Sequence, residues 1–401
     1  MMDELVIAVM SDLHAHNVSG AAAPSTFSIS GPHDQPTAHP IAGLKKLIQD
    51  FHLSADMLLC PGDIADKAQP AALSYAWNEM GAIKRLLNAD LLIATAGNHD
   101  MDSRYQYDAH DAKGTLQALA PMFPGFEHAI CDRFWARNFA ILDGDFWRLM
   151  VVNSSAYHGA GRDQGKEFQQ GRVSRHTVEA IKMELRALPP KPLNIMLCHH
   201  HLLRDTMIAQ KDYSEMVGAD LILDALGGGE FGRWMVIHGH KHHPKLFYAP
   251  GGMFAPVIFS AGSLCARLYE GLEGYARNQF YVIRLPVSRY GSMRIDLAGE
   301  IMAWDWIYLK GWQPAGKDSG LPHRSGFGCR ESFASIIPQV VRTISASKPY
   351  VKWSELTHAI PQLEFILPSD LAILLQQLNA HHRIEALFGR YGEVAELGTP
   401  L

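Results

Sequence analysis

The chain has 401 residues, of which 47% are hydrophobic and 19% are charged, so it can bury one large core or a large core plus an appendage. Its formal net charge of -5 gives no overall attraction to nucleic acid or to an anionic membrane. The five cysteines are scattered and form no CxxC pair, which argues against a zinc ribbon or a disulfide framework. No apolar run reaches the ~20 residues of a membrane span and the acidic N-terminus does not resemble a signal peptide, so we expect a cytoplasmic protein with no membrane partner.

The first two hundred residues alternate short apolar runs with helical patterns. The runs expected to be buried strands are Leu5 to Met10, Met57 to Cys60, Leu91 to Ala96 and Asn194 to Cys198. Helical spacing is found over residues 41–51, behind Pro70, and after Ser174, which is a suitable N-cap. Strand and helix in alternation predict an α/β fold.

Other parts of the sheet are expected to be antiparallel, and the C-terminal part of the chain has a different pattern. A hairpin is predicted around Asp143 and Gly144, with further strands at Trp234 to Ile237, Val257 to Ser260 and Gln279 to Leu285. The Gly-, Pro- and Ser-rich stretch 313–328 is interpreted as a linker between a large domain, 1–312, and a mainly helical module, 329–401. For that module a packing role is favoured over recognition. Asn17 to Pro40, rich in small residues, is interpreted as a lid or an insertion.

Five short polar motifs follow predicted strands, and ligands commonly bind at the carboxyl ends of strands in open α/β sheets. They are DLH with Asp12 and His14, GDIAD with Asp63 and Asp66, GNHD with Asn98, His99 and Asp100, CHHH with His199, His200 and His201, and GHKH with His240 and His242. In DLH and GHKH the two side chains are two residues apart, which places them on one face of an extended chain.

Carboxylates, an amide oxygen and imidazoles without thiolates suit manganese, iron or zinc, and argue against a structural zinc site. The potential ligands exceed what a single ion needs. With one carboxylate shared, they fit two divalent transition-metal ions ~3.5 to 4 Å apart, the arrangement that clamps the attacking and leaving oxygens in phosphoryl transfer.

The order DxH, GDxxD, GNHD, H, GHxH resembles the signature of the calcineurin-like metallophosphoesterases, over roughly residues 5 to 300. The resemblance implies two packed mixed β-sheets flanked by helices, with a binuclear centre at the sheet edge. It also implies that Asp12, His14, Asp63 and His242 bind one metal, and that Asp63 bridges to a second held by Asn98, His240 and a histidine of the triplet. His99 would act on the phosphate as electrophile or general acid, oriented by Asp100, while Asp66 would have a supporting role.

Within the triplet, relatives with a histidine pair use the first histidine after the strand, which corresponds to His199. His200 remains the alternative ligand. His200 and His201 would otherwise occupy supporting or rim positions.

The expected activity is metal-dependent hydrolysis of a phosphoester, with manganese the favoured metal. A phosphodiesterase is favoured over a protein phosphatase. Protein-phosphatase relatives follow GDxxD with Arg-Gly and end the next motif in Glu, whereas this chain has Lys67 after GDIAD and ends GNHD in Asp100. A nuclease is the alternative within the class, although no basic and aromatic cluster predicts a nucleic-acid groove. A non-catalytic scaffold of the same fold is a third possibility, which the complete set of ligands argues against.

Overall fold

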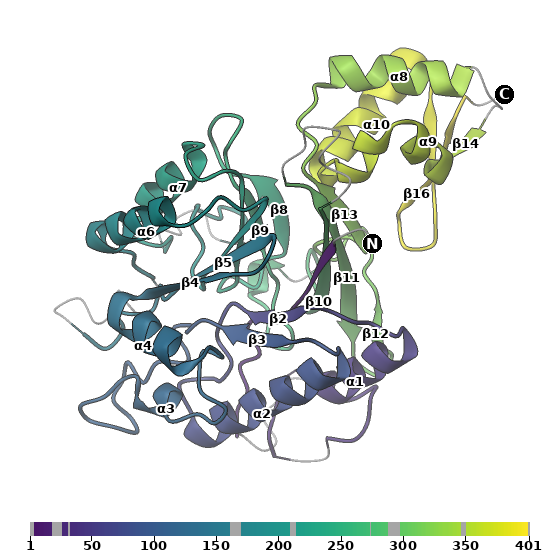
Figure 1. The fold of residues 1–401 in the computed structure, drawn as a ribbon. Helices are drawn as coiled ribbons and strands as arrows, with labels where there is room; N and C mark the ends of the chain where they lie inside the picture. Colours follow the sequence, from purple (N-terminus) through teal and green to yellow (C-terminus); the bar gives the residue numbers. More distant parts are fainter. Residues whose placement is uncertain are drawn as a thin grey trace.

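The computed structural model describes residues 4–17, 26–30, 33–160, 170–208, 214–272, 274–287, 297–345 and 350–399. Its main body contains two mixed sheets (Figure 1). The first has the order β12-β11-β10-β1-β2-β3, with β13 also paired to β11; these strands are β1 (Glu4–Val9), β2 (Met57–Cys60), β3 (Leu91–Ala94), β10 (Gln279–Pro286), β11 (Gly299–Ile307), β12 (Gly311–Pro314) and β13 (Arg324–Phe327).

The second sheet has the order β4-β5-β6-β7-β9-β8. Its strands are β4 (Phe139–Asp143), β5 (Trp147–Val152), β6 (Leu193–Leu197), β7 (Trp234–His238), β8 (Lys245–Tyr248) and β9 (Val257–Ser260). In each sheet the strands that precede the polar motifs are parallel, β1 to β2 to β3 in one and β6 to β7 in the other. The motifs therefore leave their sheets at one edge.

Alternation along the strands packs the two sheets against each other. In β6, Ile195 and Leu197 belong to the large core that also contains strands of the first sheet, whereas Met196 belongs to a second core with α6 and α7. Helices cover the outer faces, giving the expected sandwich (Figure 1). They are α1 (Pro40–Asp50), α2 (Pro70–Leu86), α3 (Gly114–Gln117), α4 (His128–Arg137), α6 (Arg175–Ala187) and α7 (Ala219–Gly227). The short 3-10 helix η1 (Glu270–Leu272) lies in the connection between β9 and β10.

Most local predictions in the main body are confirmed. The predicted strands and the hairpin all form, and α2 starts at Pro70. Ser174 caps α6, because its Oγ accepts a hydrogen bond from the Thr177 N–H at 3.1 Å.

The stretch 313–328, expected to be a linker, is instead part of the first sheet. Gln313 and Pro314 pair with β11 in β12, and β13 pairs with β11 farther along. The reason is burial: Phe327 and Ala315 are fully buried, so this segment contributes to the large core despite its glycines and prolines.

The segment from Asn17 to Pro40, expected to be a lid or insertion, is partly anchored. Residues 18–25 and 31–32 lie outside the described part of the chain. Phe27 is fully buried, its ring 5.6 Å from that of His39, and the Ile29 N–H donates to the His16 carbonyl at 2.9 Å. Phe27 therefore belongs to the large core, although small residues dominate this segment.

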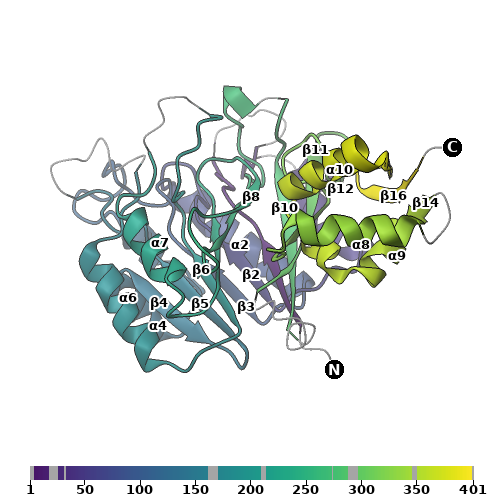
Figure 2. The same ribbon diagram turned by 90° about the horizontal axis from the view of Figure 1, so that it is seen from above.

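The C-terminal module is mainly helical, as expected, and also contains a small sheet of order β14-β16-β15. Its elements are α8 (Phe333–Ser345), β14 (Tyr350–Lys352), α9 (Trp353–Ala359), η2 (Pro361–Phe365), α10 (Pro368–His382), β15 (Glu385–Phe388) and β16 (Val394–Gly398). From above, it lies beside β10, β11 and β12, on the far side of the molecule from α4 and α6 (Figure 2). The Arg330 guanidinium, 3.9 Å from the centre of the Tyr248 ring, links it to β8.

Candidate metal centre

The five motifs converge at the shared edge of the two sheets. Asp12 and His14 follow β1, Asp63 follows β2, and Asn98 follows β3, all in the first sheet. His199 follows β6, and His240 and His242 follow β7 in the second sheet. The ligand residues of the predicted metal site thus come from both sheets.

The first group of side chains contains Asp12, His14 and His242. The Nε2 atoms of His14 and His242 are 3.2 Å apart, and the Nε2 of His242 is 3.4 Å from Oδ1 of Asp12. The Nδ1–H of His242 donates to the Arg267 carbonyl at 3.3 Å, so its Nε2 carries the lone pair that a metal would use.

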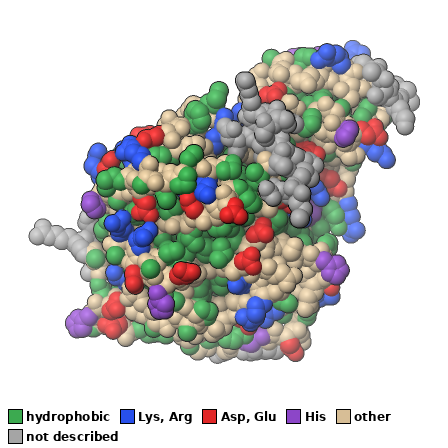
Figure 3. Space-filling view, viewed as in Figure 1, with side chains coloured by type: hydrophobic (Ala, Val, Ile, Leu, Met, Phe, Trp, Pro, Cys, Tyr) green, Lys and Arg blue, Asp and Glu red, His purple; other side chains and the backbone are tan. Residues whose placement is uncertain are grey.

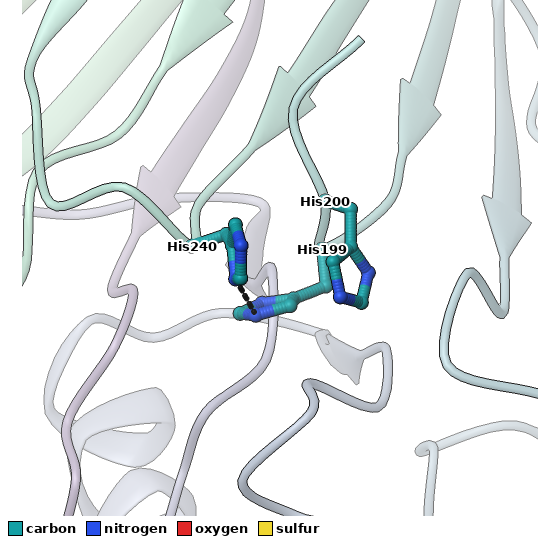
Figure 4. A group of neighbouring side chains, drawn as sticks. All are labelled: His199, His200 and His240. Carbon is teal, nitrogen blue, oxygen red and sulfur yellow. Dashed lines mark hydrogen bonds between the residues drawn. The ribbon is translucent and has the colours of Figure 1, made fainter. Parts of the chain in front are cut away.

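The second group contains Asn98, His199 and His240. The Asn98 Oδ1 lies 3.0 Å from both Nε2 of His199 and Nδ1 of His240, and these two nitrogens are 3.3 Å apart. The Nδ1–H of His199 donates to the Pro61 carbonyl at 2.8 Å, so Nε2 is the nitrogen that a metal would use once its proton is displaced. Figure 4 shows His240 directed at the His199 ring, and the two ring planes are nearly perpendicular, at 78°.

Asp63 lies between the two groups. Its Oδ2 is 3.4 Å from Nε2 of His14 in the first group and 3.4 Å from Nε2 of His199 in the second. Only 2% of its surface is exposed, and burial would raise the pKa of its carboxyl, but the facing imidazoles of His199 and His99 hold that pKa well below its usual value. The buried Asp63 carboxylate, with a histidine of each group on either side, therefore has the position expected of a ligand shared by two metal ions.

This donor set fits two divalent ions. Sets of three ligand atoms within 4.8 Å of one another include Asp12, His14 and His242, and also Asp12, Asp63 and His199. The carboxylates are buried and face imidazole nitrogens that, in their neutral form, can coordinate a metal. The same carboxylates affect His199: burial would lower its pKa, but Asp63, Asp12 and Asp100 together raise it to about 9, so a metal binding there would displace a proton.

Two glycines allow the loops to approach this closely. A Cβ on Gly97 would overlap the Asp63 carboxylate, and a Cβ on Gly239 would overlap Ser11 and Asp12. The glycines of GNHD and GHKH are therefore required sterically.

The three consecutive histidines point in different directions. His199 faces Asn98 and His240, whereas His200 Nδ1 contacts Ser154 Oγ at 2.8 Å. The His201 ring stacks on that of His240, with ring centres 5.4 Å apart and an angle of 13°. His200 and His201 are 0% and 3% exposed and both rings contact that of His240, so of the two positions expected for them, supporting or rim, the structure shows the supporting one.

His99 lies at the open side of the site, but its partner is not the expected one. Its ring is 4.6 Å from that of His14, and its Nδ1 is 2.8 Å from Oδ1 of Asp66. Burial would lower the pKa of His99, but Asp63 and Asp66 raise it.

The expected role of Asp100 is wrong, because its carboxylate turns away from the His99 ring. It accepts hydrogen bonds from the backbone N–H groups of Ile64 at 2.7 Å, Ala65 at 3.1 Å and Gly97 at 2.9 Å. Burial and Asp63 raise the pKa of Asp100 to about 6. Asp100 therefore joins the GDIAD and GNHD loops, while Asp66 orients His99.

Comparison with known protein families gives two matches. The sequence model described as calcineurin-like phosphoesterase matches residues 5–244, and that of wHTH-Calcineurin_assc, a winged helix-turn-helix module, matches residues 325–380. No curated protein sequence matches the chain. Within the described residues, no helix is long and apolar enough to cross a membrane.

Several solved structures are similar at low identity. A purple acid phosphatase from yellow lupin (Lupinus luteus) seeds is 14% identical with a TM-score of 0.48, covering 76% of this chain and 52% of its own. A phosphopantetheinyl hydrolase from Mycobacterium tuberculosis is 14% identical with a TM-score of 0.36, covering 65% of this chain and 90% of its own. A 5′-nucleotidase precursor from Thermus thermophilus is 13% identical with a TM-score of 0.34, covering 71% and 51%. The chain thus spans about half the length of the lupin and Thermus proteins.

Proposed function

Because the chain belongs to the calcineurin-like phosphoesterase family, we propose that it is a phosphodiesterase working with two divalent transition-metal ions, preferentially manganese. Asp12, His14, Asp63 and His242 would hold one ion. Asp63, Asn98, His199 and His240 would hold the other. Such ions supply Lewis-acid charge to a phosphoryl oxygen and lower the pKa of a water molecule.

The observation that carries the proposal is the His99–Asp66 pair at the open side of the ligand cluster. In hydrolysis, water supplies the oxygen of a new P–O bond, the P–O bond to one ester group breaks, and the departing alkoxide needs a proton. The His99 and Asp66 side chains are 27% and 28% exposed, compared with 2% for Asp63, so His99 is accessible to a substrate. It is held by Asp66 at 2.8 Å and can donate that proton.

The charge of the same pair favours a diester over a monoester. A phosphate monoester carries about one more negative charge than a diester near neutral pH, because its second pKa is about 6. When His99 carries its proton, the Asp66 carboxylate 2.8 Å away cancels the charge of the ring, so the pair offers no net positive charge to bind that additional charge. We also place the protein in the cytoplasm, in agreement with its five free and buried cysteines.

The test compares two substrates with the same leaving group. With Mn²⁺ bound, we expect bis(p-nitrophenyl) phosphate to be hydrolysed with at least a tenfold higher kcat/KM than p-nitrophenyl phosphate. A preference for the monoester would overturn the assignment as a phosphodiesterase. Purified protein without bound transition metal and without hydrolysis of either ester would instead favour a non-catalytic scaffold.

A nuclease is the second candidate, because a helix-turn-helix can place its second helix in the major groove. We rank it second since α10 contains no Lys or Arg, and its exposed positions include Ala372, Ile373, Gln376 and Asn379. Acidic and basic side chains are interspersed over the face of the molecule in Figure 3. Salt-dependent binding of a DNA duplex with a Kd below about 1 µM would reverse this ranking; we expect only weak binding, with a Kd of ~10⁻⁴ to 10⁻⁶ M.

A further inference from the structure

One exposed aromatic side chain, Tyr269, lies against the metal-ligand cluster. Its ring centre is 5.2 Å from that of His242, at an interplanar angle of 37°. Tyr269 is 42% exposed although His242 is only 6% exposed. Part of the tyrosine ring therefore covers the histidine, while Tyr269 itself remains exposed to solvent.

The backbone holds this ring in place. The Arg267 carbonyl, two residues earlier, accepts the Nδ1–H of His242 at 3.3 Å. The Tyr269 carbonyl accepts the Leu272 N–H at 2.9 Å, and Leu272, at the end of η1, is 1% exposed. Tyr269 is thus anchored on both sides, by a proposed metal ligand and by a buried leucine, so little ordering is needed when a ligand binds it.

Tyr269 also continues a row of rings that leads to the proposed proton donor. The His242 ring is 5.0 Å from that of His14, which is 4.6 Å from that of His99. Among the three histidines, side-chain exposure increases from 7% at His242 to 15% at His14 and 27% at His99. A phosphate held beside His14 and His99 would carry an ester group within reach of Tyr269.

We propose that Tyr269 is a stacking platform for a nucleobase, so that the substrate is a phosphodiester of a nucleoside. The inference rests on the proposed phosphodiesterase function and narrows its substrate class. Stacking on one aromatic ring suits a planar group, and it does not require the basic groove that the chain's charge makes unfavourable. A lipid ester would need a larger apolar surface, and the flanking Arg267 and Glu270 are exposed and charged.

The test uses the dinucleoside phosphate of two thymidines and the same compound with both bases removed. With Mn²⁺ bound, we expect Tyr269→Ala to lower kcat/KM for the thymidine compound about tenfold, mainly through KM, because stacking on an aromatic ring commonly contributes that much. The loss on the base-free compound should stay below about twofold. Tyr269→Phe should retain most of the wild-type preference, and metal content should be unchanged in both variants.

Phe51→Ala is the matched control. Phe51 is 55% exposed and lies at the end of α1, at the edge of the first sheet opposite the ligands, so its removal should affect neither substrate. Equal losses on both compounds in Tyr269→Ala, or no loss on either, would overturn the inference. Wild-type protein that cleaves bis(p-nitrophenyl) phosphate but neither dinucleoside compound would also overturn it. Failure to cleave any of the three diesters would instead show that the proposed function itself is wrong.

Discussion

Asp66 and Asp100 flank His99 in very different ways, and exchanging each for the corresponding amide should separate their roles. Asp66→Asn removes the charge from a 2.8 Å contact with the His99 ring. A hydrogen bond to a charged group contributes ~1.5 to 3 kcal/mol, and we take the lower end because both side chains are more than a quarter exposed. If that energy is expressed only in the transition state, kcat falls about tenfold, since ~1.4 kcal/mol corresponds to a factor of ten.

The assay compares two leaving groups with unchanged metal content. A sugar alkoxide needs a proton to depart and a nitrophenolate does not, so Asp66→Asn should slow cleavage of an alkyl diester about tenfold and that of bis(p-nitrophenyl) phosphate distinctly less. Unchanged kcat on the alkyl diester, with metals bound, would refute the role given to Asp66.

Asp100→Asn provides the contrast. An asparagine there presents an NH₂ group to backbone N–H groups that now donate to the carboxylate, for example those of Ile64 and Gly97. Leaving one of these buried donors unpaired costs ~1 to 3 kcal/mol. We therefore expect a lower free energy of unfolding and weaker metal binding, with the ratio of the two substrates unchanged in the molecules that retain metal.

Four other perturbations test the site and its support. Asp63→Asn should abolish hydrolysis and lower the content of both metals, and full activity would contradict a binuclear centre. His199→Ala should lose more metal than His201→Ala by elemental analysis; the reverse would change the assignment within the triplet. Removing the metals with a chelator should lower the midpoint temperature of thermal unfolding. Adding ions back at 100 times their Kd should raise the free energy of unfolding by ~2.7 kcal/mol. Burial would raise the pKa of the Asp205 carboxyl. His243 Nδ1 at 2.6 Å and Lys245 Nζ at 2.7 Å instead hold that pKa well below its usual value. Asp205→Asn should therefore lower the free energy of unfolding by ~2 kcal/mol, measured by urea unfolding at pH 7. The difference between variant and wild type should shrink as the pH falls below ~4, because the Asp205 carboxyl of the unfolded chain is then protonated. A difference that does not change with pH would show that ionised Asp205 does not stabilise the fold.

The metal-ligand motifs could be found from sequence because each follows a buried strand directly. A run such as Met57 to Cys60 has few alternatives to a buried strand, and the glycine after it marks the turn. Three-dimensional convergence then follows from the parallel order of β1, β2 and β3 and of β6 and β7. The edge strands β12 and β13 were harder to predict, because a glycine- and proline-rich segment is equally compatible with a linker until its contacts with β11 are known.

The carboxylate that contacts His99 could not be predicted from how close the candidate residues are in the sequence. Asp100 is its neighbour, but adjacent side chains point in different directions, and the carboxylate that reaches the ring comes from the preceding motif. Tyr269 was missed for a related reason. Its segment carries no metal-ligand motif, and only the contact with His242 places it at the site.

The backbone at the metal ligands shows why the sequence departs from local preferences there. Left-handed φ values occur at five of the proposed ligands: Asp12 (51°), His14 (45°), Asp63 (54°), His240 (76°) and His242 (53°). Each such residue costs ~1 to 2 kcal/mol that glycine would avoid, but glycine has no side chain to offer a metal. Hydrogen bonds between the loops offset the strain: the N–H of Asp12 donates to the Gly62 carbonyl at 3.1 Å, that of His14 to the Asp63 carbonyl at 2.9 Å, and that of His240 to Oδ1 of Asp12 at 3.0 Å. These bonds join the loops after β1, β2 and β7, so the ligands are gathered by the protein itself and an ion needs to order little of the chain when it binds.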